Sequence, residues 1–134
     1  MNQSVAPIEA LRRLKKNPQG RLLDVRSEGE FAKAQLPNSF NIPLLNDEHR
    51  HLVGLMYKRE GPERAMTLGH ELVDPLRAEL IQKWISGLGD ASSEDRFVTC
   101  LRGGLRSQIA CEWIESSGFE VTRVEGGFKA LRNE

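Results

Sequence analysis

The chain has 134 residues, of which 39% are apolar and 28% are charged. This is the length of one domain, and it is long enough to bury about two thirds of the unfolded surface without disulfides or metal ions. The 19 basic and 19 acidic side chains balance, which argues against a disordered chain and against a strong long-range attraction to nucleic acid. Neither a membrane span nor a signal peptide is visible, so we expect a single cytoplasmic domain over residues 1–134 with no membrane contact.

The first part of the chain alternates short helices with short strands. Ser4 is predicted to cap a helix that carries Pro7 in its first turn. Ser27 is predicted to cap a second, brief helix. Because strands flank this second helix, the succession indicates parallel strands. The expected elements are a helix ending at about residue 16, a strand at 21–25, a helix at 28–34 and a strand at 39–43.

A helical insertion is expected at about residues 46–88. Asn46 opens a helix that runs through Met56, and Pro62 opens a longer helix that is expected to continue to Trp84. The glycines and serines at 86–93 indicate a flexible connector into the next strand. We therefore expect one domain with a helical insertion between two of its strands.

Cys100 lies where a buried strand gives way to a helix. The run 96–100 predicts the strand, and 105–117 places its apolar residues on one arc of a helix. A last strand at 120–124 and a terminal helix at 126–131 complete the chain. We therefore expect an α/β fold with a parallel sheet of about five strands and helices on both faces, with Cys100 at the carboxyl edge of a central strand.

The turn after Cys100 predicts a cradle for an anion. Gly103 and Gly104 let the backbone curl tightly, so the amides from Arg102 to Arg106 can point at one spot beside the positive end of the helix dipole. The amides, the dipole and the two arginines all favour a thiolate. We therefore expect a nucleophilic Cys100 that solvent can reach, with an anion site formed by Arg102, Gly103, Gly104, Leu105 and Arg106.

Other candidate residues have simpler interpretations. Cys111 lies within a helix without basic neighbours and is predicted to pack in the core, and an inert, buried Cys100 is the plain alternative to a nucleophile. Asp24 and Arg26 emerge at the carboxyl end of a strand, where open parallel sheets place their sites, and are predicted to form a supporting ion pair. The three histidines are poorly spaced for a shared metal, so no metal site is expected.

Several stretches resemble rhodanese domains. The opening signature is LDVR at 23–26 followed by Glu30 and Phe31, then LPNS at 36–39 and NIP at 41–43. Further stretches resemble the amino-terminal rhodanese domain of the bacterial tRNA 2-selenouridine synthase family, and the resemblance runs from about Leu22 to Arg132. These stretches are VGLMYKREGPE at 53–63, LGHELV at 68–73, CLRGGLRSQ at 100–108 and RVEGGFKAL at 123–131.

The resemblance implies a rhodanese-like fold and selenium chemistry on the wobble uridine of tRNA. In that family, selenium supplied as selenophosphate replaces a 2-thio group through a geranylated intermediate, and the cysteine that matches Cys100 is required. The family enzyme continues into a C-terminal P-loop domain, and no Gly-x-x-x-x-Gly-Lys-Ser/Thr occurs here. The resemblance thus implies an excised domain or one half of a split enzyme.

The same resemblance implies the partners. The P-loop domain would act in cis or in trans and bind most of the tRNA, and a selenophosphate source protein would supply selenium. No cofactor is expected, because selenophosphate is a substrate.

Two other activities fit the same residues. Cys100, five intervening residues, Arg106 and Ser107 also match the loop of cysteine-based phosphatases and arsenate reductases, although no acidic residue is placed as the general acid that such enzymes need. A generic thiosulfate sulfurtransferase requires only the cysteine loop. A non-catalytic binding module has no need of the thiol.

Overall fold

Strands and helices alternate along the chain, as the sequence predicts for its first part. The computed structural model describes residues 3–102 and 104–133. Its elements, with the 3-10 helices written η, are β1 (Gln3–Val5), α1 (Pro7–Lys16), β2 (Arg21–Asp24), α2 (Glu28–Lys33), β3 (Ser39–Asn41), α3 (Asp47–Glu60), α4 (Pro62–Val73), η1 (Asp74–Leu76), α5 (Arg77–Leu88), η2 (Ser93–Asp95), β4 (Arg96–Thr99), α6 (Leu105–Ser116), β5 (Thr122–Val124) and α7 (Gly127–Leu131).

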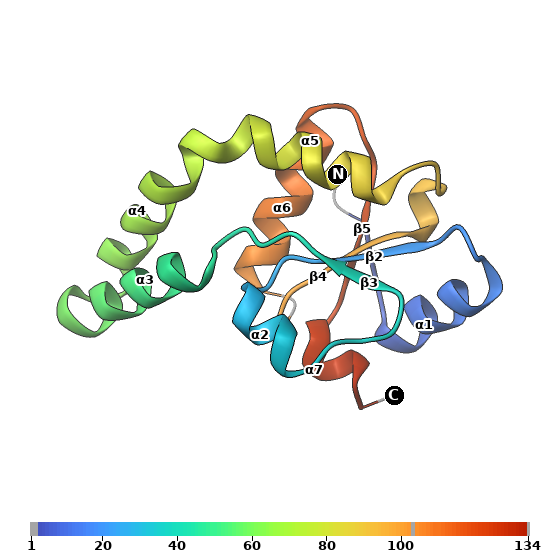
Figure 1. Cartoon of the computed structure of the whole chain (residues 1–134), viewed down its shortest axis with the longest axis horizontal. Helices are drawn as coiled ribbons and strands as arrows, with labels where there is room; N and C mark the ends of the chain where they lie inside the picture. The colour runs from blue at the N-terminus through green and yellow to red at the C-terminus, as the bar shows by residue number, and fades with distance from the viewer. Residues whose placement is uncertain (1–2, 103, 134) are drawn as a thin grey trace.

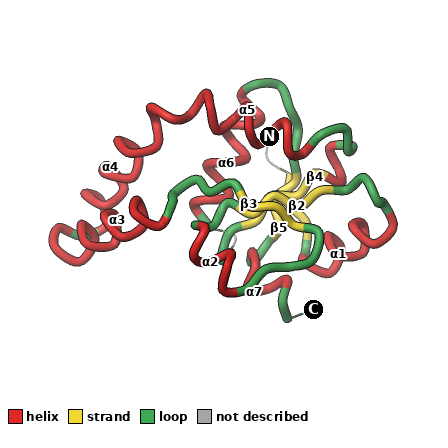
Figure 2. Tube along the Cα trace, viewed as in Figure 1, coloured by secondary structure: helices red, strands yellow, loops and turns green. Residues whose placement is uncertain are grey.

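The strands form one five-stranded parallel sheet in the order β1-β5-β4-β2-β3, with β4 at the centre (Figure 2). This confirms the predicted α/β fold. The strand β1 was not predicted: Ser4 pairs with Arg123 of β5 instead of capping α1, and the residue before α1 is Ala6, which makes no side-chain cap. Three residues carry too little periodicity to reveal a strand whose partner lies more than a hundred residues away.

Helices cover both faces of the sheet (Figure 1). Successive strand residues point to opposite faces, so Leu22 and Phe97 face one side while Leu23 and Val98 face the other. The first pair packs in a cluster with residues of α1 and α7, and the second pair packs in a larger cluster with residues of α5 and α6. None of the described helices is long and apolar enough to cross a membrane.

Three α-helices lie between β3 and β4, and here one prediction is wrong. The long helix expected from Pro62 to Trp84 is broken by the 3-10 turn η1, which contains Pro75. Proline has no N–H to donate and its ring clashes with the preceding turn, so the α-helical hydrogen bonds cannot continue. As a result α5 packs on the sheet, whereas α3 and α4 pack against each other and extend away from it (Figures 1 and 2).

Two helical glycines give a matched test of this packing. A methyl group on Gly87 of α5 would overlap the ring of Phe40, whereas a methyl group on Gly54 of α3 would meet no atom within 4 Å. Alanine favours helix over glycine, so Gly54→Ala should raise the free energy of unfolding by up to about 1 kcal/mol. Gly87→Ala should lower it by about 1–3 kcal/mol because Phe40 must move. Urea unfolding of both variants measures the difference, and an equal gain in both would contradict the packing of α5 on β3.

Candidate active site

The candidate site lies at the carboxyl edge of the sheet, where β4 and β2 end side by side. Thr99 is in register with Asp24 at the ends of these strands, and the Val25 amide donates to the Thr99 carbonyl at 2.9 Å. Cys100 follows β4 directly. The cysteine therefore lies at the carboxyl edge of the central strand, as the sequence predicts, and the structure adds that the end of β2 lies beside it.

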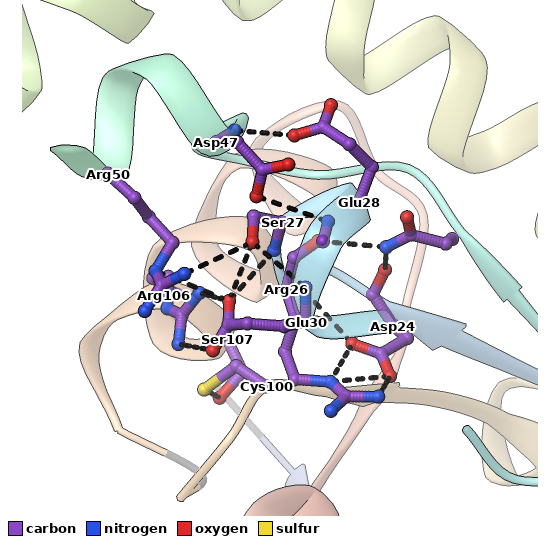
Figure 3. Close-up of polar contacts among 12 residues, drawn as sticks. Asp24, Arg26, Ser27, Glu28, Glu30, Asp47, Arg50, Cys100, Arg106 and Ser107 are labelled. Atoms are coloured by element: carbon purple, nitrogen blue, oxygen red, sulfur yellow. Dashed lines mark hydrogen bonds and ion pairs between the residues drawn. The ribbon is translucent and has the colours of Figure 1, made fainter. Parts of the chain in front are cut away.

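The Cys100 thiol lies beneath the first turn of α6. Its Sγ donates to Ser107 Oγ at 3.3 Å, and Ser107 Oγ donates to the Gly104 carbonyl at 3.1 Å. Cys100 is only 3% exposed, so the expectation that solvent reaches the thiol is wrong for this conformation. The physical reason is that Ser107, itself buried, lies over the sulfur (Figure 3).

The loop after Cys100 turns its first carbonyls away from the site. The Cys100 carbonyl accepts from the Phe128 amide at 2.7 Å, and the Leu101 carbonyl accepts from the Lys129 amide at 2.9 Å. Among the described residues, no acceptor is found for the amides of Arg102, Gly104, Leu105 and Arg106, and α6 has no side-chain cap at its start. Such an uncapped helix start suits an anion. Gly103, named with this site from the sequence, lies outside the described residues.

The two arginines of the loop differ sharply. Arg102 is exposed, like Gly104 and Leu105, so the rim of the loop faces solvent although the thiol does not. Arg106 is held by Glu30 of α2, with distances of 2.7 Å from Nη1 to Oε1 and 3.2 Å from Nη2 to Oε2 (Figure 3). Burial alone would lower the pKa of Arg106, but the hydrogen bonds and charge of Glu30 raise it. Arg106 is therefore not a free cation here.

Glu30 stands in the opening signature of the sequence, but it was not predicted to belong to the site. It belongs to the capping box of α2, where its carboxylate accepts from the Ser27 amide at 3.0 Å, and Arg50 of α3 lies 3.4 Å from the same oxygen. The Ser27-to-Glu30 spacing reveals the cap. The pairing with Arg106, 76 residues away, has no local signal.

The charge of Glu30 depends on these partners. Burial would raise the pKa of Glu30, but the hydrogen bonds from Arg106 and Ser27 and the positive charges of Arg106 and Arg50 lower it from 4.5 to about 2. The carboxylate is therefore ionised at neutral pH, and it links α2, α3 and α6 at the mouth of the site.

The predicted ion pair between Asp24 and Arg26 is present. Both side chains are 2% exposed, and Arg26 Nη2 lies 2.8 Å from Asp24 Oδ2. Arg26 also donates to the Ala34 carbonyl at 2.8 Å and lies over the Phe128 ring at 3.9 Å. It thus connects the end of β2 with α7, whose first amides hold the cysteine loop.

Cys111 lies in α6 and is buried. Burial raises its pKa to about 12, because the loss of hydration of the thiolate outweighs the attraction of the Arg123 charge. This placement agrees with the predicted packing role. Among residues 3–102 and 104–133, no three His, Cys, Asp or Glu side chains gather in the way that a metal site would need.

The Glu30 network can be tested by acid unfolding. A carboxylate whose pKa is lower in the folded state stabilises the fold above its unfolded pKa, and that stability is lost as pH falls from about 4.5 towards 2. After solvent screening we expect this contribution to be at most about 2 kcal/mol. Glu30→Gln should be less stable than the unaltered chain at pH 7 and should show a flatter stability profile in this window. The exposed Glu48→Gln is the control, and identical profiles for all three proteins would contradict the network.

Comparison with known proteins agrees with this geometry. The profile of the rhodanese-like domain matches residues 7–134. The chain is 48% identical to the tRNA 2-selenouridine synthase of Sulfurovum sp. (strain NBC37-1) over 84% of the chain and 30% of that protein. It is 37% identical to the enzyme of the same name from Shewanella sediminis (strain HAW-EB3) over 98% of the chain and 35% of that protein. The chain thus spans about a third of the length of these relatives.

Solved structures give the same fold. The N-terminal domain of a protein from Clostridium difficile 630, described as ATP/GTP binding, superposes with a TM-score of 0.83 at 29% identity, over 98% of this chain and 97% of that one. The human single-domain sulfurtransferase TSTD1 superposes with a TM-score of 0.57 at 20% identity, over 100% of this chain and 98% of that one, which supports the fold alone. With a parallel sheet, a cysteine after its central strand and a profile match over nearly the whole chain, this protein belongs to the rhodanese family.

Proposed function

We propose that Cys100 accepts selenium or sulfur from a small anionic donor and carries it for the conversion of 2-thiouridine to 2-selenouridine at the wobble position of tRNA. The observation that supports this most is the position of Cys100, directly after the central strand and below a helix start whose amides have no acceptor among the described residues. The substrate is proposed from the relatives, which are named tRNA 2-selenouridine synthases.

The loading step needs a thiolate and a place for the leaving anion. The Cys100 thiolate attacks the terminal chalcogen of the donor, and the bond between that atom and the rest of the donor breaks, with its electron pair leaving on the departing group. Thiosulfate would give Cys–S–S⁻ and sulfite. Selenophosphate would give Cys–S–Se⁻ and release phosphorus as phosphite. In this proposal the amides at the start of α6 stabilise first the donor anion and then the bound chalcogen anion.

The loop residues take different parts in this proposal. Arg102, which is exposed, and the amides of Gly104 and Leu105 contact the donor directly. Arg106 supplies its charge nearby and, through Glu30, fixes the start of α6. Because Ser107 covers the sulfur, attack by the thiolate requires a small opening of this loop and rotation of the Ser107 hydroxyl away from the sulfur. Asp24 and Arg26 support the loop from below.

The whole reaction is proposed to need a second part. The relatives are about three times as long as this chain, and the solved neighbour with the highest TM-score given above is one domain of a protein described as ATP/GTP binding. We propose that a P-loop domain, in cis or in trans, binds most of the tRNA, and that a selenophosphate source protein provides the donor. This chain has zero formal net charge, so it gains little from counterion release on a polyanion.

The loading step can be measured by mass spectrometry. Incubation of the chain with selenophosphate should add selenium to Cys100 and release phosphite. Thiosulfate should load sulfur more weakly than selenophosphate loads selenium. Equal loading from the two donors would instead indicate a general sulfurtransferase. Cys100→Ser should gain no mass, whereas Cys111→Ser should load like the unaltered chain, because the Cys111 pKa of about 12 keeps that thiol protonated. Selenium on Cys100→Ser would show that another residue is the acceptor. A phosphoryl group on Cys100, with release of hydrogen selenide, would instead favour the phosphatase-like chemistry.

A further inference from the structure

A groove lies between α1 and the segment that leads into β3. It has a volume of about 1260 Å³, and Leu22 of β2, which is buried, lies at its base. Sites for small ligands typically have volumes of about 300–1,000 Å³, so this groove has room for a segment of another protein. It lies at the amino ends of β2 and β3, where Arg21 and Ser39 line it, whereas Cys100 lies at the carboxyl edge of the sheet. An occupant of the groove therefore leaves the cysteine loop open.

Apolar side chains from α1 and from the segment before β3 line the groove. On α1, Ile8, Leu11 and Lys15 follow one another at spacings of three and four residues, so they share one face of the helix. Leu36 and Phe40 contribute from the segment before β3. Ile8 is 54% exposed. Isolated exposed apolar residues are ordinary, but a contiguous set around a hollow indicates a binding surface.

The charged residues that line the groove are all cations. They are Arg12, Lys15 and Arg21, and no carboxylate lines it. Arg12 is paired with Glu9 at 2.8 Å. Lys15 and Arg21 are exposed and form no ion pair within residues 3–102 and 104–133. Two positive charges of the groove are therefore left for a partner.

The segments that bound the groove carry the same surplus of positive charge. Residues 34–40 have no charged side chain, and residues 7–22 have a single carboxylate, Glu9, against Arg12, Arg13, Lys15, Lys16 and Arg21. Among the described residues, one more carboxylate contacts a lining residue, because Asp95 accepts from Asn17 Nδ2 at 2.7 Å. Since the cations outnumber these two carboxylates, electrostatic complementarity favours an occupant that is rich in Asp and Glu.

The last helix of the domain lies beside this groove. α7 packs against α1 (Figure 1), and its Leu131 lies in one cluster with Leu11, Leu14 and Leu36, which line the groove. The similar chain from Clostridium difficile 630 is described as an N-terminal domain, so the rest of that protein follows the counterpart of α7. A second domain that follows α7 would therefore begin next to the groove.

We propose that this groove is the docking surface for the second part of the enzyme, through a segment of that part in which apolar side chains are flanked by carboxylates. This rests on the proposed function, which needs a P-loop domain in cis or in trans. Such a segment would cover the apolar base of the groove and pair with Lys15 and Arg21. A nucleic acid fits less well, because its bases stack on exposed aromatic rings. The ring of Phe40, the one aromatic side chain in the described lining, is partly buried beside Gly87.

Two adjacent lysines of α1 give a matched test. Lys15 and Lys16 are both exposed, but Lys15 lines the groove and Lys16 does not. The Sulfurovum sp. synthase is produced as a hybrid in which the region that matches this chain is replaced by this chain. Acetylation of each lysine by acetic anhydride is followed by mass spectrometry in the hybrid and in the isolated chain. If docking is about nine-tenths complete, Lys15 should react about tenfold more slowly in the hybrid, while Lys16 stays within about twofold.

The charge of the occupant is tested in the same hybrid. Ile8→Glu places a carboxylate against the acidic segment and should return Lys15 to within about twofold of its rate in the isolated chain. Thr67→Glu adds the same charge at an exposed residue of α4 that does not line the groove, and it should leave Lys15 slow. At an ionic strength of about 1 M, where the screening length falls to about 3 Å, Lys15 of the hybrid should also react faster.

Several outcomes would overturn the proposal. These are equal rates for Lys15 in the hybrid and in the isolated chain, equal slowing of Lys15 and Lys16, or a slow Lys15 that neither Ile8→Glu nor salt restores. A further one is slowing of Lys15 in the isolated chain by a tRNA that carries 2-thiouridine, without slowing in the hybrid alone, because the groove would then belong to RNA.

Chalcogen loading separates this proposal from the function on which it rests. Selenium loading of Cys100 in the isolated chain should be the same with Ile8→Glu or Thr67→Glu as without them, because the groove lies at the other edge of the sheet. Loading without slowing of Lys15 in the hybrid contradicts the docking surface alone. Slowing of Lys15 without loading contradicts the proposed function of Cys100 and leaves the docking surface in place.

Discussion

The buried pair of Asp24 and Arg26 holds together the segments that build the site. The Arg26 guanidinium contacts the Asp24 carboxylate at the end of β2, the Ala34 carbonyl at the exit of α2 and the Phe128 ring of α7. Phe128 in turn donates its amide to the Cys100 carbonyl. Removing either charge would leave the other buried and unpaired, which typically costs 3–5 kcal/mol. The shape of the cysteine loop therefore depends on a salt bridge beneath it that never touches the sulfur.

At the mouth of the site, the positive charges of Arg106 and Arg50 lie beside the negative charge of Glu30. Glu30 compensates Arg106 and approaches Arg50, while the exposed Arg102 has no ion pair among the described residues. The loop therefore presents the amides at the start of α6 and the exposed Arg102, whereas Arg106 is engaged by Glu30. The compensated Arg106 ties the start of α6 to α2.

Local patterns in the sequence predict the sheet, the position of Cys100 and the Asp24–Arg26 pair, because alternation, glycine placement and strand ends are all readable within a few residues. Three features escape such patterns. The strand β1 is defined by its pairing with β5, which is distant in sequence. The break at Pro75 interrupts a stretch whose residues on both sides favour a helix. The Glu30–Arg106 pair joins segments that are far apart in the chain. The burial of the thiol also escapes, since it depends on the rotamer of Ser107 rather than on the loop that the glycines permit.

The cover that Ser107 places over Cys100 has a consequence for oxidation of the thiol. Oxidation of a cysteine to sulfenic and then sulfinic acid begins with attack by the sulfur on peroxide and requires an accessible thiolate. With 3% of Cys100 exposed and its proton directed at Ser107 Oγ, the closed loop denies peroxide an approach to the sulfur. Under the proposed function, a donor anion that binds the amides at the start of α6 would favour the open loop, so the thiol would become reactive mainly when the donor is bound.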